Sequence, residues 1–338
     1  MTAGRARITL AEAEALCVRA AIGAGASEDC AGSIARAAVA AEADGQPTVG
    51  LSHFVDYLES LVAGRIDGRA EPVLSRPAAA IILSDAGGGS AHLGFDRAFD
   101  EFVSLAGLLG IAAFAQSNAY TCGSLGWFAG RLAERGLVAV AATNGPPMLA
   151  GSGTTKPVFC TNPLAFAAPR SGGPPLLIDQ ASSATAFVNV RAASQRGEAL
   201  PDGWALGPDG RPTDDPAAAM RGALLAFGGA KGANIALMVE VLAAGLTGAN
   251  WSLDAPSITG GTESPGSGLF VVAIAPKLFG PDFEARLDAH MRRLHVDYGL
   301  HVPGDARARL RETAATEGLE VEADVLRTIA SFAEQRRG

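Results

Sequence analysis

The chain has 338 residues, of which 48% are hydrophobic and 18% are charged, and its formal net charge is −8. Such a length has room for about two domains with buried cores, and this composition excludes a disordered protein. We expect no nucleic-acid partner, because phosphate binding needs basic stripes and the sequence shows none. No apolar run reaches the ~18 residues of a membrane span, and the first residues lack a signal-peptide core, so we expect a cytoplasmic protein without membrane contact.

The first 65 residues predict three helices. A T-x-x-E capping box at 9–12 precedes the first helix, and Ser27 opens a second that runs to about Asp44. Apolar residues over 51–62 recur at helical spacing, and Gly64 is placed to end that third helix.

The rest of the chain alternates strand and helix patterns. Strands are expected at 80–84, 110–117, 137–144 and 268–275, with further β and turn signals over 162–179. Helices are expected at 91–109, 122–136 and 232–246, and two closing helices at about 281–298 and 321–335. Nearly continuous apolar residues over 232–246 predict a helix that is buried on most sides.

Generic functional motifs are absent. There is no GxGxxG fingerprint of a Rossmann domain, no phosphate loop ending in GK[ST], and no GxSxG nucleophile elbow. The four cysteines are widely spaced and the five histidines lack ligand spacing, so neither a disulfide framework nor a metal site is expected.

Four widely separated segments resemble the type-2 malate/L-lactate dehydrogenase family. This family includes enzymes for malate, sulfolactate, ureidoglycolate, diketogulonate and cyclic imino acids. The segments are AATNGPP (141–147) with CTNPLAFAAP (160–169) and LLIDQASSA (176–184); PDGWALGPDGRPTDDP (201–216); FGGAKGANIALMVEVLAAGLTGA (227–249); and HVPGDARARLRE (301–312).

The resemblance implies an α/β fold outside the Rossmann class. A nicotinamide-binding domain on a mainly antiparallel sheet is expected over 116–280. A mainly helical domain for dimerisation and substrate binding is expected from both chain ends, 1–115 together with 281–338. The resemblance also implies a homodimer, NADPH or NADH as cofactor, and a small substrate that carries a carboxylate.

The implied cofactor residues lie in five parts of the chain. The segment SNAYTCGSL (117–125) resembles the family's N-S-x-H-F segment, and a helix start near Cys122 would suit a pyrophosphate; a tight packing turn is the alternative. Arg307 and Arg309 are candidates for adenosine phosphate contacts or else solvated helix charges, and Lys231 contacts cofactor or caps a buried helix start. The full set of candidates is Ser117, Asn118, Thr121, Cys122, Gly123, Ser124, Leu125, Thr161, Gln180, Ala181, Ser182, Lys231, Gly232, Gly304, Arg307 and Arg309.

The catalytic segment departs from the family pattern. Family members carry Ser-His-Gly near the third helix, an Arg four residues past that His, and an Asp in a D-x-A-T-S segment. Here the Asp is present as Asp179, but an ungapped alignment places Thr48 and Val49 at the Ser-His pair and His53 at the Arg position. A second family histidine is replaced by Ala119.

A Ser-His pair does occur four residues further on, as Ser52 and His53. Four helical residues rotate by about 400°, which returns a side chain to nearly the same face. His53 would then donate a proton or hold the substrate carboxylate, and a plain surface histidine is the alternative. The catalytic candidates are therefore Ser52, His53, Thr48 and Asp179.

The missing proton-handling groups favour one substrate class. Reduction of a 2-oxo acid creates an alkoxide that needs a nearby acid, whereas a cyclic imine is basic enough to be protonated before hydride transfer. We therefore expect an NAD(P)H-dependent reductase that converts Δ1-pyrroline-2-carboxylate or Δ1-piperideine-2-carboxylate to the L-amino acid. The alternatives are a 2-hydroxy acid dehydrogenase of the malate or lactate type, with His53 as relocated acid, and a non-catalytic dimeric cofactor-binding protein.

Overall fold

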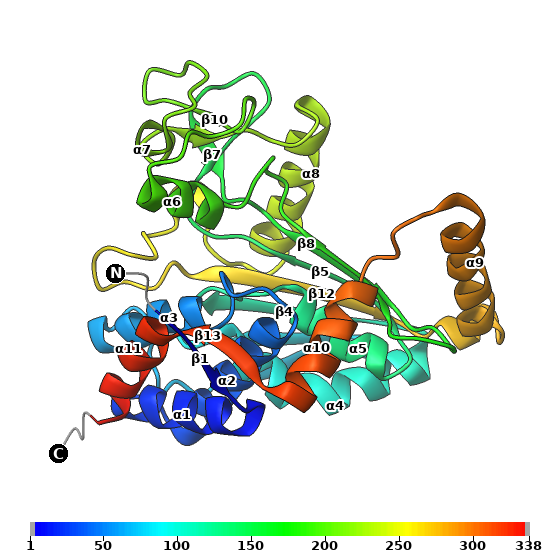
Figure 1. The fold of residues 1–338 in the computed structure, drawn as a ribbon. Helices are drawn as coiled ribbons and strands as arrows, with labels where there is room; N and C mark the ends of the chain where they lie inside the picture. Colours follow the sequence, from blue (N-terminus) through cyan, green and yellow to red (C-terminus); the bar gives the residue numbers. More distant parts are fainter. Residues whose placement is uncertain (1–3, 335–338) are drawn as a thin grey trace.

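Both ends of the chain build one helical layer (Figure 1). The computed structural model describes residues 4–334. In it a short antiparallel pair, β1 (Arg5–Ile8) with β13 (Leu319–Glu322), joins the two ends, and the helix from the C-terminal end packs against α1 and α3. The helices are α1 (Leu10–Gly23), α2 (Glu28–Ala43), α3 (Leu51–Ala63) and α11 (Ala323–Ala333). A helical unit made from both chain ends, as predicted, is confirmed.

Local signals fix the ends of these helices. The Thr9 hydroxyl accepts from the Glu12 N–H and the Glu12 carboxylate accepts from the Thr9 N–H, which confirms the capping box. Ser27 caps α2 through the Cys30 N–H, and Gly64 ends α3 with a φ of 79°, a conformation that favours glycine.

A seven-stranded sheet forms the centre of the molecule. Its strands in spatial order are β2 (Val73–Ala78), β3 (Ile81–Asp85), β4 (Ile111–Ala119), β12 (Ser267–Ile274), β5 (Val138–Thr143), β8 (Leu164–Ala168) and β9 (Leu176–Gln180). Every neighbouring pair is antiparallel except β3 with β4, so the predicted mainly antiparallel sheet is confirmed. The edge strand β2 was not predicted.

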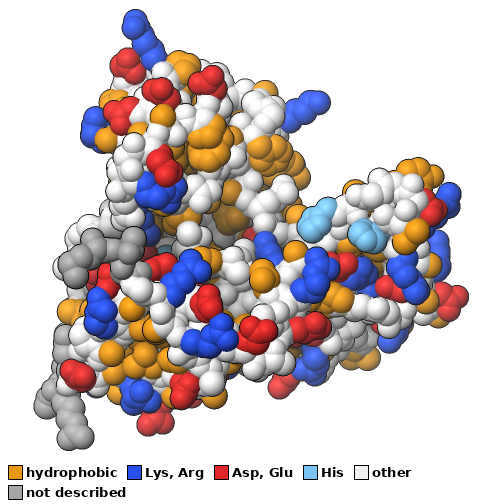
Figure 2. Space-filling view, viewed as in Figure 1, with side chains coloured by type: hydrophobic (Ala, Val, Ile, Leu, Met, Phe, Trp, Pro, Cys, Tyr) orange, Lys and Arg blue, Asp and Glu red, His pale blue; other side chains and the backbone are white. Residues whose placement is uncertain are grey.

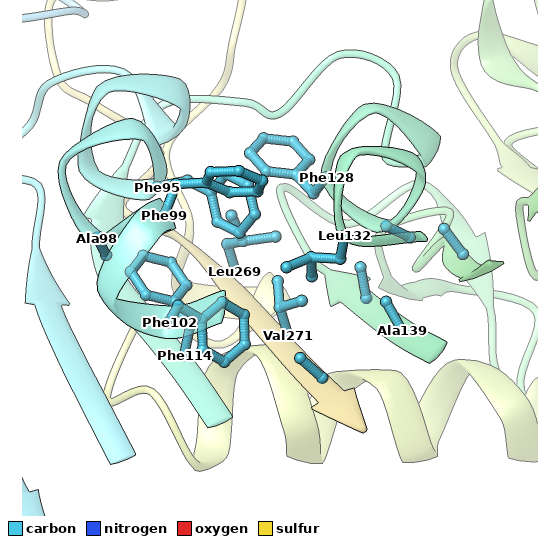
Figure 3. Packing of buried hydrophobic residues seen from close by; sticks show 14 of the residues in the cluster. Phe95, Ala98, Phe99, Phe102, Phe114, Phe128, Leu132, Ala139, Leu269 and Val271 are labelled. Carbon is cyan, nitrogen blue, oxygen red and sulfur yellow. The ribbon is translucent and has the colours of Figure 1, made fainter. Parts of the chain in front are cut away.

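Two helices, α4 (Ala91–Leu109) and α5 (Gly126–Glu134), pack on this sheet. Phe95 of α4 meets Phe114 of β4 and Phe128 of α5 edge-on, with ring centroids 5.6 and 5.1 Å apart (Figure 3). Burial of each such ring contributes about 1.5–3 kcal/mol to stability. The loop between β4 and α5 is therefore anchored at both ends on a packed core.

A smaller sheet forms an upper lobe (Figures 1 and 2). Its strands in spatial order are β10 (Ala205–Leu206), β11 (Ala223–Leu224), β6 (Leu149–Ala150) and β7 (Pro157–Phe159). The helices of this lobe are α6 (Phe187–Arg196), α7 (Pro216–Ala219) and α8 (Ala230–Glu240). The sequence did not predict α6, whose apolar periodicity is weak.

The helix predicted over 232–246 differs from expectation in two ways. It begins at Ala230, and after Glu240 it continues as a π-helical turn over Val241–Gly245. Within the single chain Leu237 and Met238 are 51% and 59% exposed, so burial on most sides stays a prediction that depends on a second copy. Only one face of α8 packs on its own chain.

The C-terminal part contains three helices where two were predicted. They are α9 (Phe283–Tyr298), α10 (Asp305–Glu317) and α11, and the expected end at 335 lies outside the described residues. Charged α10 has no clear apolar stripe, and it is held on α2 by two hydrogen bonds of 2.8 and 2.9 Å from Arg311 to Asp44. Helix α9 extends away from the body as an arm (Figures 1 and 2).

The predicted domain boundary between residues 115 and 116 falls inside β4, which pairs with β3 on one side and β12 on the other. The two expected units thus share one sheet, and the division into domains stays a prediction. In residues 4–334, no helix is long and apolar enough to cross a membrane.

Candidate active site

A cavity of about 410 Å³ lies between α3 of the helical layer and α6 of the upper lobe. Its walls are mainly apolar, with hydroxyl groups and a few charges. Its lining residues are His53, Asp56, Tyr120, Pro146, Pro147, Met148, Phe187, Val188, Arg191, Ala219, Met220, Gly222, Leu224, Ala255, Ser257, Ile258 and Thr259. The space is large enough for a small organic acid beside a planar ring.

His53 is held at the wall of this cavity by three neighbours. Its Nδ1 lies 2.9 Å from Asp56 Oδ2, and its Nε2 lies 3.4 Å from Thr121 Oγ1. The ring packs edge-on against Tyr57, with centroids 4.7 Å apart. Because Asp56 accepts at Nδ1, Nε2 is the ring nitrogen that remains for a substrate, next to Thr121.

Asp56 keeps its charge beside His53. Burial alone would raise the pKa of Asp56, but the hydrogen bond and charge of His53, with the charge of Arg191 3.7 Å away, hold it below its usual value. An ionised Asp56 accepts the hydrogen bond from His53 Nδ1 and orients the imidazole. The pair can therefore hold a proton at the cavity wall and deliver it.

The helical premise of the predicted Ser-His displacement is wrong, and the catalytic roles of Thr48 and Ser52 stay predictions. Residues 47–50 form a turn, and α3 begins only at Leu51, so Thr48 is not on the helix. Both Thr48 and Ser52 are exposed and neither lines the cavity. Of the predicted pair, His53 alone reaches the site.

Asp179 lies at a different place, the N-terminus of α5. Its Oδ2 accepts from the Gly126 N–H at 2.8 Å and from the Ser124 hydroxyl at 3.3 Å, and Arg307 is 3.8 Å away. Burial raises the pKa of Asp179, and the Gly126 N–H and then Arg307 oppose this shift. The carboxylate therefore lies at a helix start, where the N–H of Gly126 is its closest partner.

The helix start predicted near Cys122 is also wrong. Leu125 caps α5 and Gly126 is its first residue, because Gly123 adopts a φ of 60° that an α-helix excludes. Cys122 is buried with its Sγ 3.3 Å from Thr143 Oγ1, so its side chain packs the loop, and a backbone contact with cofactor stays a prediction. A Cβ at Gly123 would lie 3.0 Å from Tyr57 Oη, which explains the glycine.

Two further candidates for cofactor binding, Ser117 and Asn118, lie near the end of β4. Asn118 has a φ of 54° and donates from Nδ2 to Asp85 Oδ1 at 3.0 Å, and Ser117 pairs with Asp85 across β3 and β4. Ala119, which stands at the family's second histidine, is fully buried and offers no proton. Their contact with cofactor stays a prediction.

Residues 179–182 lead from the start of α5 to the upper lobe. The Ser182 N–H donates to Thr161 O at 2.8 Å, and the Phe227 N–H donates to Ser182 O at 3.1 Å. Gln180 is exposed and Ala181 is half-buried at the end of β9. These contacts place Thr161 beside residues 180–182, next to the loop that precedes α8.

The two candidates at the start of α8 have separate environments. Lys231 is exposed, so it does not cap a buried helix start. A Cβ at Gly232 would lie 2.0 Å from Phe227 O, so the position requires glycine for packing. Neither observation tests a cofactor contact.

Arg307 has a buried donor that faces an anion of its own chain. Its Nη1 makes no hydrogen bond to the described residues but lies 3.8 Å from Asp179 Oδ2, so its contact with a cofactor phosphate stays a prediction. Gly304 precedes α10 with a φ of 100°, where a Cβ would lie 2.7 Å from Pro175 O, and Arg309 is exposed on the same helix. When bound, a reduced nicotinamide would supply the hydride to a substrate in the cavity beside His53.

Among the charged residues that line the cavity, sequence reasoning missed Asp56 and Arg191. The signal for Asp56 was present, since it lies three residues after His53 on the same helix face. Arg191 had no local signal, because α6 meets α3 only in the folded chain.

Comparisons with known proteins agree with this architecture. Residues 8–330 match the family described as malate/L-lactate dehydrogenase. The chain is 37% identical to a (2R)-3-sulfolactate dehydrogenase (NADP(+)) of Chromohalobacter salexigens, covering 97% of this chain and 98% of that protein. It is also 37% identical to a Δ1-pyrroline-2-carboxylate/Δ1-piperideine-2-carboxylate reductase of Pseudomonas putida, covering 88% of each chain.

A solved structure gives the same result. The crystal structure of Δ1-piperideine-2-carboxylate reductase from Pseudomonas syringae pvar. tomato superposes with a TM-score of 0.93 at 33% identity, covering 97% of this chain and 99% of that one. Similarity of this extent spans nearly the whole chain. The chain therefore belongs to the malate/L-lactate dehydrogenase family and is an oxidoreductase.

Proposed function

We propose that the protein reduces a small cyclic imino acid, Δ1-pyrroline-2-carboxylate or Δ1-piperideine-2-carboxylate, to the L-amino acid. The observation that carries this proposal is the His53–Asp56 pair at the wall of a mainly apolar cavity of about 410 Å³. Apolar walls suit the carbon ring of the substrate, and the pair suits its basic nitrogen. The names of the relatives from Pseudomonas support the same substrate class.

Imine reduction needs only one proton donor from the chain. His53, held at Nδ1 by Asp56, donates a proton to the ring nitrogen, and hydride arrives at the adjacent carbon, so the C=N bond becomes a neutral CH–NH group. Asp56 holds the imidazole in position through its contact with Nδ1. No second acid is needed, which agrees with Ala119 and Val49 at the positions of family histidines.

A 2-hydroxy acid dehydrogenase is the second candidate. The 37% identity to a sulfolactate dehydrogenase favours it, and His53 would then protonate the alkoxide. Here the reaction needs a full proton transfer to oxygen as hydride arrives. Loss of His53 would therefore damage this reaction more than imine reduction.

We propose NADPH as the preferred reductant. The relative from Chromohalobacter carries NADP(+) in its name, and α10 presents Arg307 and the exposed Arg309 as cations for a further phosphate. NADPH should therefore give a higher kcat/KM than NADH with the same substrate. Equal values would leave the cofactor preference without support.

We further propose a homodimer in the cytoplasm. Helix α8 exposes Leu237 and Met238, which form an apolar face suited to a second copy. The free thiols of Cys17, Cys30 and Cys122 are buried, as suits a reducing compartment.

An assay panel tests the function. Purified protein with NADPH or NADH is given each cyclic imino acid and, in parallel, pyruvate, oxaloacetate and sulfopyruvate. We expect kcat/KM to be at least about tenfold higher for the imines, with activity falling as pH rises past the pKa of the imine. Higher kcat/KM for a 2-oxo acid would establish the second candidate instead, and turnover of none would indicate the non-catalytic alternative.

A further inference from the structure

We propose that Arg191 of α6 binds the carboxylate of the substrate opposite His53 and limits the site to acids with a single negative charge. This inference rests on the proposed reduction of a cyclic imino acid. Arg191 lies outside the segments that carry the family resemblance. Its role follows from its place in the cavity.

Arg191 reaches the cavity from one face of α6. Phe187 and Val188, four and three residues earlier on the helix, line the same cavity. Its Nη2 lies 3.7 Å from Asp56 Oδ2, which is beyond the range of a direct hydrogen bond. The planar donor fork of Arg191 is therefore available to a carboxylate, which it can bind through two parallel hydrogen bonds.

The charges of the cavity suit one carboxylate. Among the described residues that line it, Arg191 is the one with a permanent positive charge, and Asp56 is the one carboxylate. A substrate carboxylate at Arg191 is matched in charge. A second anionic group would meet Asp56 or the apolar wall, which is unfavourable because a buried charge needs a partner.

The spacing also suits a 2-imino acid. Asp56 Oδ2 is 2.9 Å from His53 Nδ1 and 3.7 Å from Arg191 Nη2, so His53 and Arg191 both lie next to the same carboxylate. In a cyclic 2-imino acid, the nitrogen and the carboxylate are bonded to the same carbon. Arg191 can therefore hold one group while His53 serves the other.

A binding cycle tests this inference without turnover. The probes are pyrrole-2-carboxylate, a flat ring that cannot be reduced by hydride in this way, and pyrrole-2-carboxamide, which has the same shape without the charge. Both are titrated by calorimetry, in the presence of NADPH, into wild type, Arg191→Gln and Arg196→Gln. Arg196 is the matched control, because it lies on the same helix but is exposed and paired with Glu198.

We expect wild type and Arg196→Gln to bind the carboxylate at least about tenfold more tightly than the carboxamide, since the bond is charge-assisted. Arg191→Gln should lose this preference, and Arg191→Lys should recover part of it. A preference that persists in Arg191→Gln, or one that is absent from wild type, overturns the inference. A melting temperature of Arg191→Gln close to wild type confirms that the variant is folded.

Steady-state kinetics separate this inference from the proposed function. Arg191→Gln should raise KM for the imine by roughly 10- to 100-fold with a smaller change in kcat, because ground-state binding is lost. An enzyme that reduces imines with an unchanged KM in Arg191→Gln keeps the proposed function and rejects this inference. An enzyme that reduces no imine but shows the binding cycle rejects the function and keeps Arg191 as the carboxylate site.

Discussion

The carboxylate of Asp179 accepts a 2.8 Å hydrogen bond from the N–H of Gly126, the first residue of α5. An anion at a helix N-terminus is stabilised by the free N–H groups and the helix dipole. The same contact fixes the loop that carries Thr121 to the side of His53. Asp179 thus supports the site from outside the cavity.

Substitution of Asp179 distinguishes this supporting role from proton transfer. Asp179→Ala leaves the Gly126 N–H without its acceptor, so we expect the free energy of unfolding to fall by about 1–2 kcal/mol and kcat/KM to fall by roughly 10²-fold. Asp179→Asn keeps an amide oxygen for that N–H and should retain kcat/KM within about tenfold. Urea unfolding and steady-state kinetics measure both. A fully stable but inactive Asp179→Asn would show that Asp179 itself transfers a proton.

His53 and Ser52 should respond differently although they are neighbours. His53→Ala removes the proton donor at the cavity wall, and we expect kcat/KM to fall by roughly 10²-fold or more. Ser52→Ala should change kcat/KM less than about twofold, because Ser52 is exposed and does not line the cavity. Equal losses of kcat/KM in the two variants would show that Ser52 and His53 act together in catalysis. Unchanged kinetics in His53→Ala would show that His53 has no role in the reaction.

His92 should make stability depend on pH. It is fully buried between Tyr57 and Phe128, and burial lowers its pKa from 6.5 to about 4. Below pH 6.5 the unfolded chain therefore binds a proton that the folded chain does not, so stability falls as pH falls from 6.5 toward 4. This group alone should cost about 2 kcal/mol between pH 7 and pH 5.

The measurement is urea unfolding of wild type and His92→Phe at these two pH values. Phenylalanine has a similar flat shape and cannot be protonated, so the pH-dependent loss should shrink by about 2 kcal/mol in the variant. The same pH dependence in both proteins would mean that His92 does not cause it. The comparison uses the change in the free energy of unfolding between the two pH values in each protein. A packing change that is the same at both pH values therefore does not affect it.

Helix α8 should carry the dimer contact. Charges at Leu237 and Met238, introduced together as glutamates, should convert the dimer to a monomer in light scattering at micromolar concentration. Leu108→Glu is the control, because Leu108 is 77% exposed on α4, away from α8. A monomeric wild type would reject the dimer, and an unaffected dimer in the double variant would move the interface elsewhere.

Much of the fold was predictable because its signals are local. Thr9 with Glu12, Ser27 and Gly64 fixed helix ends through contacts within four residues. The family segments then implied the antiparallel sheet and the helical layer from both chain ends. Helix α10 was missed because its stability comes from Arg311 on Asp44, a contact distant in sequence.

By itself the sequence determined the family, the helix caps and the presence of a histidine near the third helix. The tertiary structure decided which groups that histidine meets, because the folding of α6 over α3 brings Arg191 to Asp56 and leaves Ser52 outside. It also decided that α5 begins at Gly126, where the distant Asp179 supplies an acceptor for its first N–H. Such contacts depend on the packing of remote elements, and no local pattern encodes them.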